Sequence, residues 1–105
     1  MASDAPDARV SGKAVRHLRG LGHELDAVVQ IGKDGLTDGV VAAAAAALLT
    51  HELIKVRVLT DAPVDRKEVA AALATATGAL LAQVLGRTFL LYKRHPKKPK
   101  IVLPK

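Results

Sequence analysis

The sequence has 105 residues, enough for one domain of ordinary size and too few for two separate cores. Half of it is apolar, but Phe89 and Tyr92 are the only aromatic residues, so aliphatic side chains must build the core. The absence of cysteine excludes disulfides and thiolate metal sites. The acidic residues 1–7 do not resemble a signal peptide, and the longest apolar run, residues 40–49, is shorter than the roughly 20 residues that cross a bilayer. We therefore expect a cytoplasmic protein without membrane contact.

The positive charge is concentrated at the C-terminal end. The net charge is +6 and the sequence pI is about 10.0. Residues 93–105 hold six basic residues and no acidic one, whereas residues 1–92 are formally neutral. The basic pI therefore does not by itself predict that the folded body binds polyanions, and such a tail can also serve only solubility.

A first helix is predicted after Ser11, which is a favourable N-cap residue. Its expected buried face is apolar at helical spacing: Ala14, Leu18, Leu21 and Leu25. Basic residues recur at steps of three on the opposite side: Lys13, Arg16 and Arg19. This stripe fits either an ordinary solvated helix face or an anion-binding surface.

Short strands and helices then alternate. Strands are predicted at residues 27–31, 53–59, 80–85 and 88–93, with the last two forming a hairpin around Gly86 and Arg87. A second helix begins after the N-cap Thr37 and closes at residues 51–52, and a third is predicted at residues 64–77, before Gly78. In the second strand Lys55 and Arg57 alternate with the expected core residues Ile54, Val56 and Val58.

This order, α-β-α-β-α-β-β, predicts an α+β domain in which helices pack against a mixed four-stranded sheet. We expect residues 1–9 to be a disordered N-terminal segment, residues 10–95 to form the domain, and residues 96–105 to form a basic tail rich in proline and lysine. Pro96 and Pro99 favour an extended tail, and the apolar residues 101–103 are expected to pack back on the domain or to pair with a sheet edge.

No set of residues predicts catalysis, a metal site or a cofactor. The histidines lie far from any acidic cluster and lack metal-ligand spacing: His17, His23, His51 and His95. The carboxylates are scattered, and neither serine lies in a nucleophile elbow. We therefore expect no enzymatic activity and no small-molecule substrate.

A Gly-x-x-Gly tetrad, Gly32-Lys33-Asp34-Gly35, separates the first strand from the second helix. It is either a connecting turn or a phosphate-binding loop. Glycines allow a phosphodiester backbone to come close, the helix after Thr37 presents free N–H groups, and Lys33 can reach a phosphate. RNA-binding KH domains clamp backbone nucleotides with such a loop. The carboxylate of Asp34 counts against the second interpretation.

Five segments, in order, carry a resemblance to a known family. They are KAVRHLRGLGHEL at residues 13–25, VVQIGKDGLT at 28–37, HELIKV at 51–56, GRTFLLY at 86–92 and KPKIVLP at 98–104. Together they resemble the stand-alone bacterial form of the CRM domain, named for chloroplast RNA splicing and ribosome maturation. The resemblance implies a fold like the C-terminal domain of bacterial translation initiation factor three, RNA binding, and association with precursors of the large ribosomal subunit.

The family's site, transferred by this resemblance, falls on the loop, on the basic face of the first helix and on the Gly-Arg turn. The residues are Gly32, Lys33, Asp34, Gly35, Lys13, Arg16, Arg19 and Arg87, to which the N-cap Thr37 is added as a helix start that can receive a phosphate. With so few aromatic residues, we expect recognition of structured RNA by its backbone, by a monomer. The alternatives are a protein-docking assembly factor in which only the tail touches RNA, an enzyme acting on RNA or nucleotides, and a DNA-binding protein.

Overall fold

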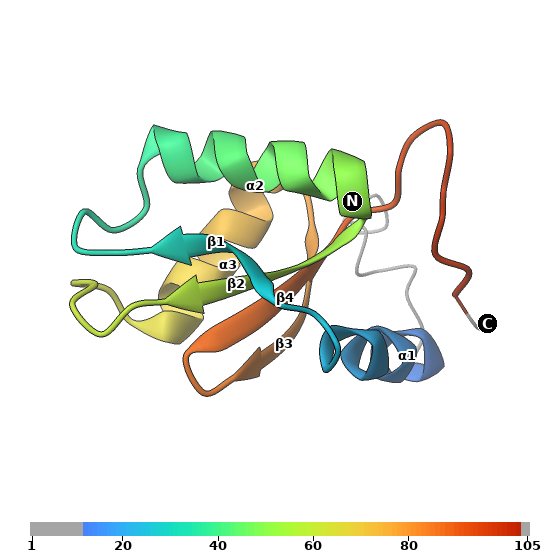
Figure 1. Ribbon diagram of the computed structural model, residues 1–105, viewed down its shortest axis with the longest axis horizontal. Helices are drawn as coiled ribbons and strands as arrows, with labels where there is room; N and C mark the ends of the chain where they lie inside the picture. Colours follow the sequence, from blue (N-terminus) through green and yellow to red (C-terminus); the bar gives the residue numbers. More distant parts are fainter. Residues whose placement is uncertain (1–11, 104–105) are drawn as a thin grey trace.

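A computed structural model describes residues 12–103 (Figure 1). Its elements, in chain order, are α1 (Gly12–Gly22), β1 (Ala27–Ile31), α2 (Asp38–His51), β2 (Leu53–Val58), α3 (Arg66–Thr77), β3 (Leu80–Leu85) and β4 (Thr88–Tyr92). This confirms the predicted α+β class and the α-β-α-β-α-β-β order. The likeness to the initiation factor domain stays a prediction. The predicted N-cap Ser11 and the N-terminal segment 1–9 lie outside the described residues.

The four strands form one mixed sheet in the order β1-β2-β4-β3. β1 pairs with β2 in parallel, which places α2 in the crossover between them. β4 pairs antiparallel with both β2 and β3, and the β3–β4 hairpin is the one predicted from the sequence. Two backbone irregularities interrupt the pairing, one near Val28 in β1 and one near Ala82 in β3.

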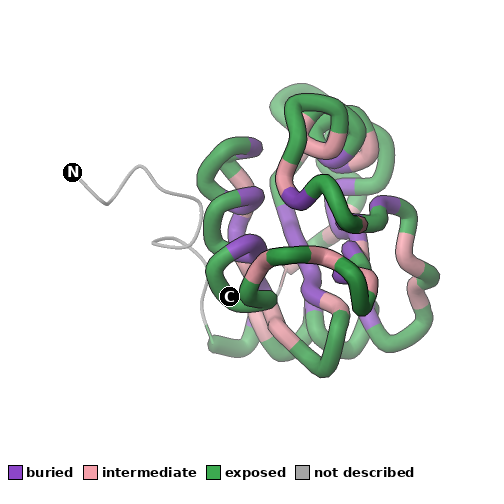
Figure 2. The backbone as a smooth tube through the Cα atoms, turned by 90° about the vertical axis from the view of Figure 1, so that its left-hand side faces the viewer, coloured by how far each residue is buried: buried purple, intermediate pink, exposed green. Residues whose placement is uncertain are grey.

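The sheet has helices on both faces. One face packs against α2 and α3 in an aliphatic cluster that includes Ile54, Val56 and Phe89. The other face packs against α1 in a smaller cluster, which we call the α1 cluster: Leu18, Leu53, Leu80, Ala82, Leu90 and Tyr92. Figure 2 shows that the buried positions follow the strands and the inward sides of the helices. Successive residues of β2 and β4 alternate between the clusters, as the period of a strand requires.

Helix ends are fixed by caps. The hydroxyl oxygen of Thr37 accepts a hydrogen bond from the backbone N–H of Val40 at 3.1 Å, which confirms the predicted N-cap. α3 begins two residues later than predicted, because the carboxylate of Asp65 caps it by accepting from two backbone N–H groups. Gly78 ends α3 at φ +71°, the left-handed conformation expected of a glycine C-cap. β2 and β4 each end one residue earlier than predicted.

The predicted inner face of α1 is partly wrong. Ala14 and Leu18 are buried, but the next buried position is Gly22, and the side chain of Leu21 is 37% exposed. Leu25 lies beyond the end of the helix, half-buried at the edge of the α1 cluster. The error arises because residues 14, 18 and 22 continue one row of the helix, and a glycine gives no apolar signal in a sequence pattern.

The C-terminal segment returns to the domain. Ile101 and Leu103 pack against the α1 cluster, while Val102 between them is 84% exposed. No strand is assigned to residues 93–103, so this segment packs on the domain and does not extend the sheet. In Figure 1 it runs back at the end of the molecule where α1 lies.

Candidate nucleic-acid interface

The Gly-x-x-Gly loop is a tight turn closed by one backbone hydrogen bond, from the N–H of Gly35 to the carbonyl of Gly32 at 2.9 Å. Gly35 is buried with φ +70°, so its own backbone requires glycine. Gly32 has no such requirement: a Cβ there would meet only Leu59, at an ordinary contact distance of 3.6 Å. Lys33 and Asp34 are exposed at the tip. The turn conformation thus explains Gly35, whereas Gly32 leaves space beside the backbone.

Three loops meet at the same end of the sheet. The β1–α2 loop, the β2–α3 loop and the β3–β4 turn all lie at one end of the molecule (Figure 1). Leu59 N–H donates to the carbonyl of Ile31 at 2.8 Å, and Val58 N–H donates to the carbonyl of Arg87 at 2.7 Å. The guanidinium of Arg66 donates to the carbonyl of Gly86 at 2.8 Å. Arg87 and Lys33 therefore share this end, which we call the loop end.

The N-terminus of α2 follows the loop but carries an acidic residue. Thr37 has a structural role as the cap, and Asp38 occupies the first turn, where its charge suits the positive end of the helix dipole. The same charge opposes a phosphate at this helix end. Helix capping is therefore a sufficient reason for Thr37, and a phosphate contact would be a second role of this residue.

The basic residues of α1 do not join the loop. Lys13, Arg16 and Arg19 are all exposed, but α1 covers the other end of the sheet, away from the β1–α2 loop (Figure 1). Arg19 is also not purely a solvent-facing residue, since its Nε donates to the carbonyl of Ala82 on the edge strand β3 at 3.3 Å. The structure thus separates the predicted site into two groups.

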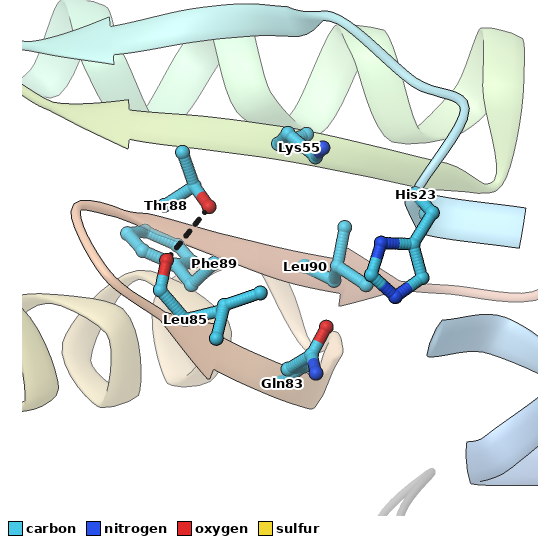
Figure 3. A pocket seen from close by; sticks show the side chains of 8 residues that line it. His23, Lys55, Gln83, Leu85, Thr88, Phe89 and Leu90 are labelled. Carbon is cyan, nitrogen blue, oxygen red and sulfur yellow. Dashed lines mark hydrogen bonds between the residues drawn. The ribbon is translucent and has the colours of Figure 1, made fainter. Parts of the chain in front are cut away.

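Two basic residues that the sequence analysis did not assign to the site lie between these groups. α1 covers only one end of its sheet face (Figure 1). Lys55 and Arg57 of β2 belong to this face, because they alternate with residues of the opposite cluster, and neither is fully buried. Lys55 lines a small hollow with His23, Gln83 and Thr88, as Figure 3 shows. The hydroxyl of Thr88 in this hollow donates to the carbonyl of Leu85 at 3.0 Å.

Arg57 continues this surface toward the loop end. It lines a second, open hollow together with Arg87, between Thr60, Asp61 and Thr88. The sheet register places Gln30 and Thr88 on either side of Arg57. We call Lys55, Arg57 and Arg87 the basic track. For Lys55 and Arg57, the signal in the sequence was the alternation of basic with apolar residues in β2. It indicated that both lie on one face of the sheet, but not that α1 would leave this face open.

Within residues 12–103 no three His, Cys, Asp or Glu side chains gather so that they could hold a metal ion. None of the helices described is long and apolar enough to span a membrane. Both aromatic rings of the chain are internal, with Phe89 1% and Tyr92 3% exposed. Burial raises the pKa of the Tyr92 phenol, and the neighbouring Glu52 carboxylate raises it further.

Comparison with known proteins identifies the family. Residues 10–93 match the CRS1 / YhbY (CRM) domain family. The chain is 39% identical over 95 residues to the "Probable RNA-binding protein YqeI" of Bacillus subtilis, an alignment that covers 90% of this chain and 99% of that protein. It is 38% identical over 96 residues to the "RNA-binding protein" of Haemophilus influenzae, covering 91% of this chain and 96% of the relative.

Among solved structures, the solution structure of the hypothetical protein SAV1595 from Staphylococcus aureus superposes with a TM-score of 0.77 at 38% identity, covering 90% of this chain and 99% of that one. The chain belongs to the CRS1 / YhbY (CRM) domain family, which confirms the resemblance read from its motifs.

Proposed function

We propose that this protein binds structured RNA, and that its target is ribosomal RNA in precursors of the large ribosomal subunit. Relatives that align over almost their whole length are named RNA-binding proteins, which supports the first part. The observation that carries the proposal is the basic track, which runs from the end of α1 across the open sheet face to the β2–α3 loop and the β3–β4 turn. The Gly-x-x-Gly loop lies at the same end of the sheet.

Recognition proceeds through the phosphate backbone and not through base stacking. No phenyl, phenol or indole ring reaches the surface, because Phe89 and Tyr92 are the chain's only such residues and both are buried. Lys33 at the loop tip and Arg87 in the neighbouring turn receive phosphates at the loop end, and Gly32 lets the RNA backbone come close. Lys55 and Arg57 continue the contact, and Lys13, Arg16 and Arg19 extend it along α1. The protein acts in the cytoplasm, as a monomer and without enzymatic activity.

A second candidate is a protein-docking assembly factor whose only RNA contact is the basic tail. The formal neutrality of residues 1–92 favours it. So does an apolar groove between the end of α1 and β1, where Leu21 and Val28 are exposed.

Fluorescence anisotropy with large-subunit ribosomal RNA fragments, in a salt series, separates the two candidates. The informative variants are Lys33→Gln and Arg87→Gln, which each remove one charge at the loop end. The matched control is Ala46→Glu on the exposed side of α2, because it changes the net charge by the same amount at a distant position. Removing one lysine or arginine that binds a phosphate should lower the salt slope by about one and the affinity by about five-fold.

We expect both loop-end variants to weaken binding while Ala46→Glu binds like the parent protein. If all three variants bind equally well, and replacing the exposed cations Arg94, Lys97 and Lys98 with glutamine abolishes binding, the folded body does not contact RNA and the docking factor becomes the better account. If the parent protein binds no fragment more tightly than an unrelated RNA of equal length, the ribosomal target is wrong.

A further inference from the structure

The basic C-terminal segment is held to the domain by a buried carboxylate. Glu52 follows α2 at φ 64° and is 0% exposed. Its backbone N–H donates to the carbonyl of Leu48 at 2.8 Å, and its own carbonyl accepts from the N–H of Lys93 at 2.8 Å. An unusual backbone conformation for glutamate thus directs its side chain into the space between the end of α2 and the returning chain.

Among the described residues, the hydrogen-bond donors to the Glu52 carboxylate are all backbone N–H groups. Oε2 accepts from the N–H of His95 at 2.8 Å, and Oε1 accepts from the N–H groups of Lys100 and Ile101 at 2.6 and 2.7 Å. Burial alone would raise the pKa of this carboxyl, but the three N–H donors outweigh it and hold the pKa below its ordinary value. The group is therefore ionised at neutral pH, although among residues 12–103 no lysine or arginine side chain pairs with it.

A second acceptor shapes the turn between these contacts. The Nδ1 atom of His95 accepts from the backbone N–H groups of Lys97 and Lys98 at 3.0 and 2.9 Å, which requires the neutral ring with its proton on Nε2. Residues 93–100, which we call the hook, are thus fixed by side chains that bind their backbone. Two lysines also bind the domain: Lys93 Nζ donates to the carbonyl of Thr77, and Lys100 Nζ to that of Thr50.

The remaining cations of the hook have no partner among residues 12–103. Arg94, Lys97 and Lys98 are exposed, and within the described part of the chain none of their side chains makes a hydrogen bond or ion pair. Three such cations lie within five residues, on a backbone ordered before any ligand binds. Figure 1 places this segment at the end of the molecule opposite the loop end.

We infer that the hook is a second phosphate-binding surface, ordered in advance by Glu52 and His95, which takes the backbone of the same RNA. This inference rests on the proposed function. Nucleic acid fits better than an acidic protein because the basic track and the hook lie at separate places on one molecule, and a long polyanion can contact both. The tail thus acts as a shaped contact and not as a flexible polycation, whose attraction would depend only on charge.

The direction in which RNA affinity changes in Glu52→Gln distinguishes an ordered hook from a flexible polycation. Glu52→Gln keeps every lysine and removes a negative charge, so attraction by charge alone would strengthen RNA binding. The amide nitrogen of glutamine is a donor and would face one of the backbone N–H groups that now bind the carboxylate, so the hook would lose its order. Loss of this order would weaken RNA binding. His95→Ala removes the acceptor for Lys97 and Lys98 at a partly exposed position and tests the same point if Glu52→Gln does not fold.

The experiment measures anisotropy binding of the full chain to the same ribosomal RNA fragments. We expect Glu52→Gln and His95→Ala each to lose affinity about five-fold, with faster trypsin cleavage between Lys97 and Lys98, since the Lys98-Pro99 bond resists trypsin. The double variant Lys97→Gln/Lys98→Gln should lose more and lower the salt slope by about two. The double variant Ala43→Glu/Ala46→Glu, at two exposed positions of α2, changes the net charge by the same amount as Lys97→Gln/Lys98→Gln and serves as its control.

The outcomes separate the two hypotheses. If the parent protein fails to bind RNA, the proposed function is wrong and the hook inference falls with it. If it binds, but His95→Ala binds as tightly while its hook is cleaved faster, the hook inference alone is overturned. Polyglutamate binding that depends on the hook, with RNA binding unchanged in all hook variants, would assign the hook to an acidic protein and also overturn the inference.

Discussion

The seating of α1 on the sheet depends on the absence of one side chain. Gly22 is buried against β4, and a Cβ at this position would overlap Leu90 Cδ1, lie 2.8 Å from Cδ2 and 3.1 Å from Cγ. Leu90 is itself buried in the α1 cluster, so its whole side chain would have to move within packed surroundings. Gly20, two residues earlier in the same helix, is exposed and has no atom within 4 Å of such a Cβ.

The two glycines therefore form a matched pair for the change to alanine. In a helix, alanine is favoured over glycine by about 1 kcal/mol, so Gly20→Ala should raise the free energy of unfolding by up to that amount. Overpacking costs roughly 1–3 kcal/mol, so Gly22→Ala should lower the free energy of unfolding by up to about 2 kcal/mol after the helix gain is subtracted. The two variants should differ by about 1–3 kcal/mol.

Urea denaturation followed by circular dichroism measures both values, and the m-values should stay equal if the unfolded states are alike. Equal stability of the two variants, or a Gly22→Ala variant more stable than the parent, would refute the close contact between α1 and β4. A lower melting point for Gly22→Ala with the α3 amides unaffected in hydrogen exchange would further locate the damage to the α1 side of the sheet.

Three further results are expected from the structure. The stabilisation by the Glu52 carboxylate is present above its ordinary pKa of 4.5 and is lost as the pH falls through the lower pKa of the folded state. The difference in the free energy of unfolding between the parent and Glu52→Gln, measured by urea titration, should therefore shrink below about pH 4.5. Gly78→Ala places a Cβ at φ +71° and should cost about 1–2 kcal/mol in thermal denaturation, unless α3 ends differently. Thr37→Ala removes the cap of α2 and should cost about 1 kcal/mol, whereas Lys33→Gln, on the exposed loop tip, should leave the melting temperature unchanged.

Much of the fold could be predicted because the local signals agreed with one another. Period-two alternation identified β2, Thr37 and Gly78 identified helix ends, and the Gly86-Arg87 turn identified the hairpin. The inner face of α1 was misjudged where packing used a glycine, since the missing side chain matters only against Leu90, which is 68 positions away in the sequence.

The site was less predictable because it depends on topology. The joining of Lys33 and Arg87 at one end requires the parallel pairing of β1 with β2 and the antiparallel pairing of β2 with β4, which no single motif contains. The separation of α1 from the loop end likewise follows from which part of the sheet α1 covers. Glu52 resembled an ordinary residue at a helix end, because its three donors lie 43 to 49 positions later.

The α1 cluster brings together nearly the first and nearly the last described residues of the chain. Its packing is complete only when Ile101 and Leu103 are present, whereas the cluster beneath α2 and α3 needs no residue beyond Leu91. During synthesis from the N-terminus, every residue of the larger cluster is made before the segment that completes the smaller one. Docking of α1 and attachment of the hook are therefore expected to be one late event in the maturation of this protein.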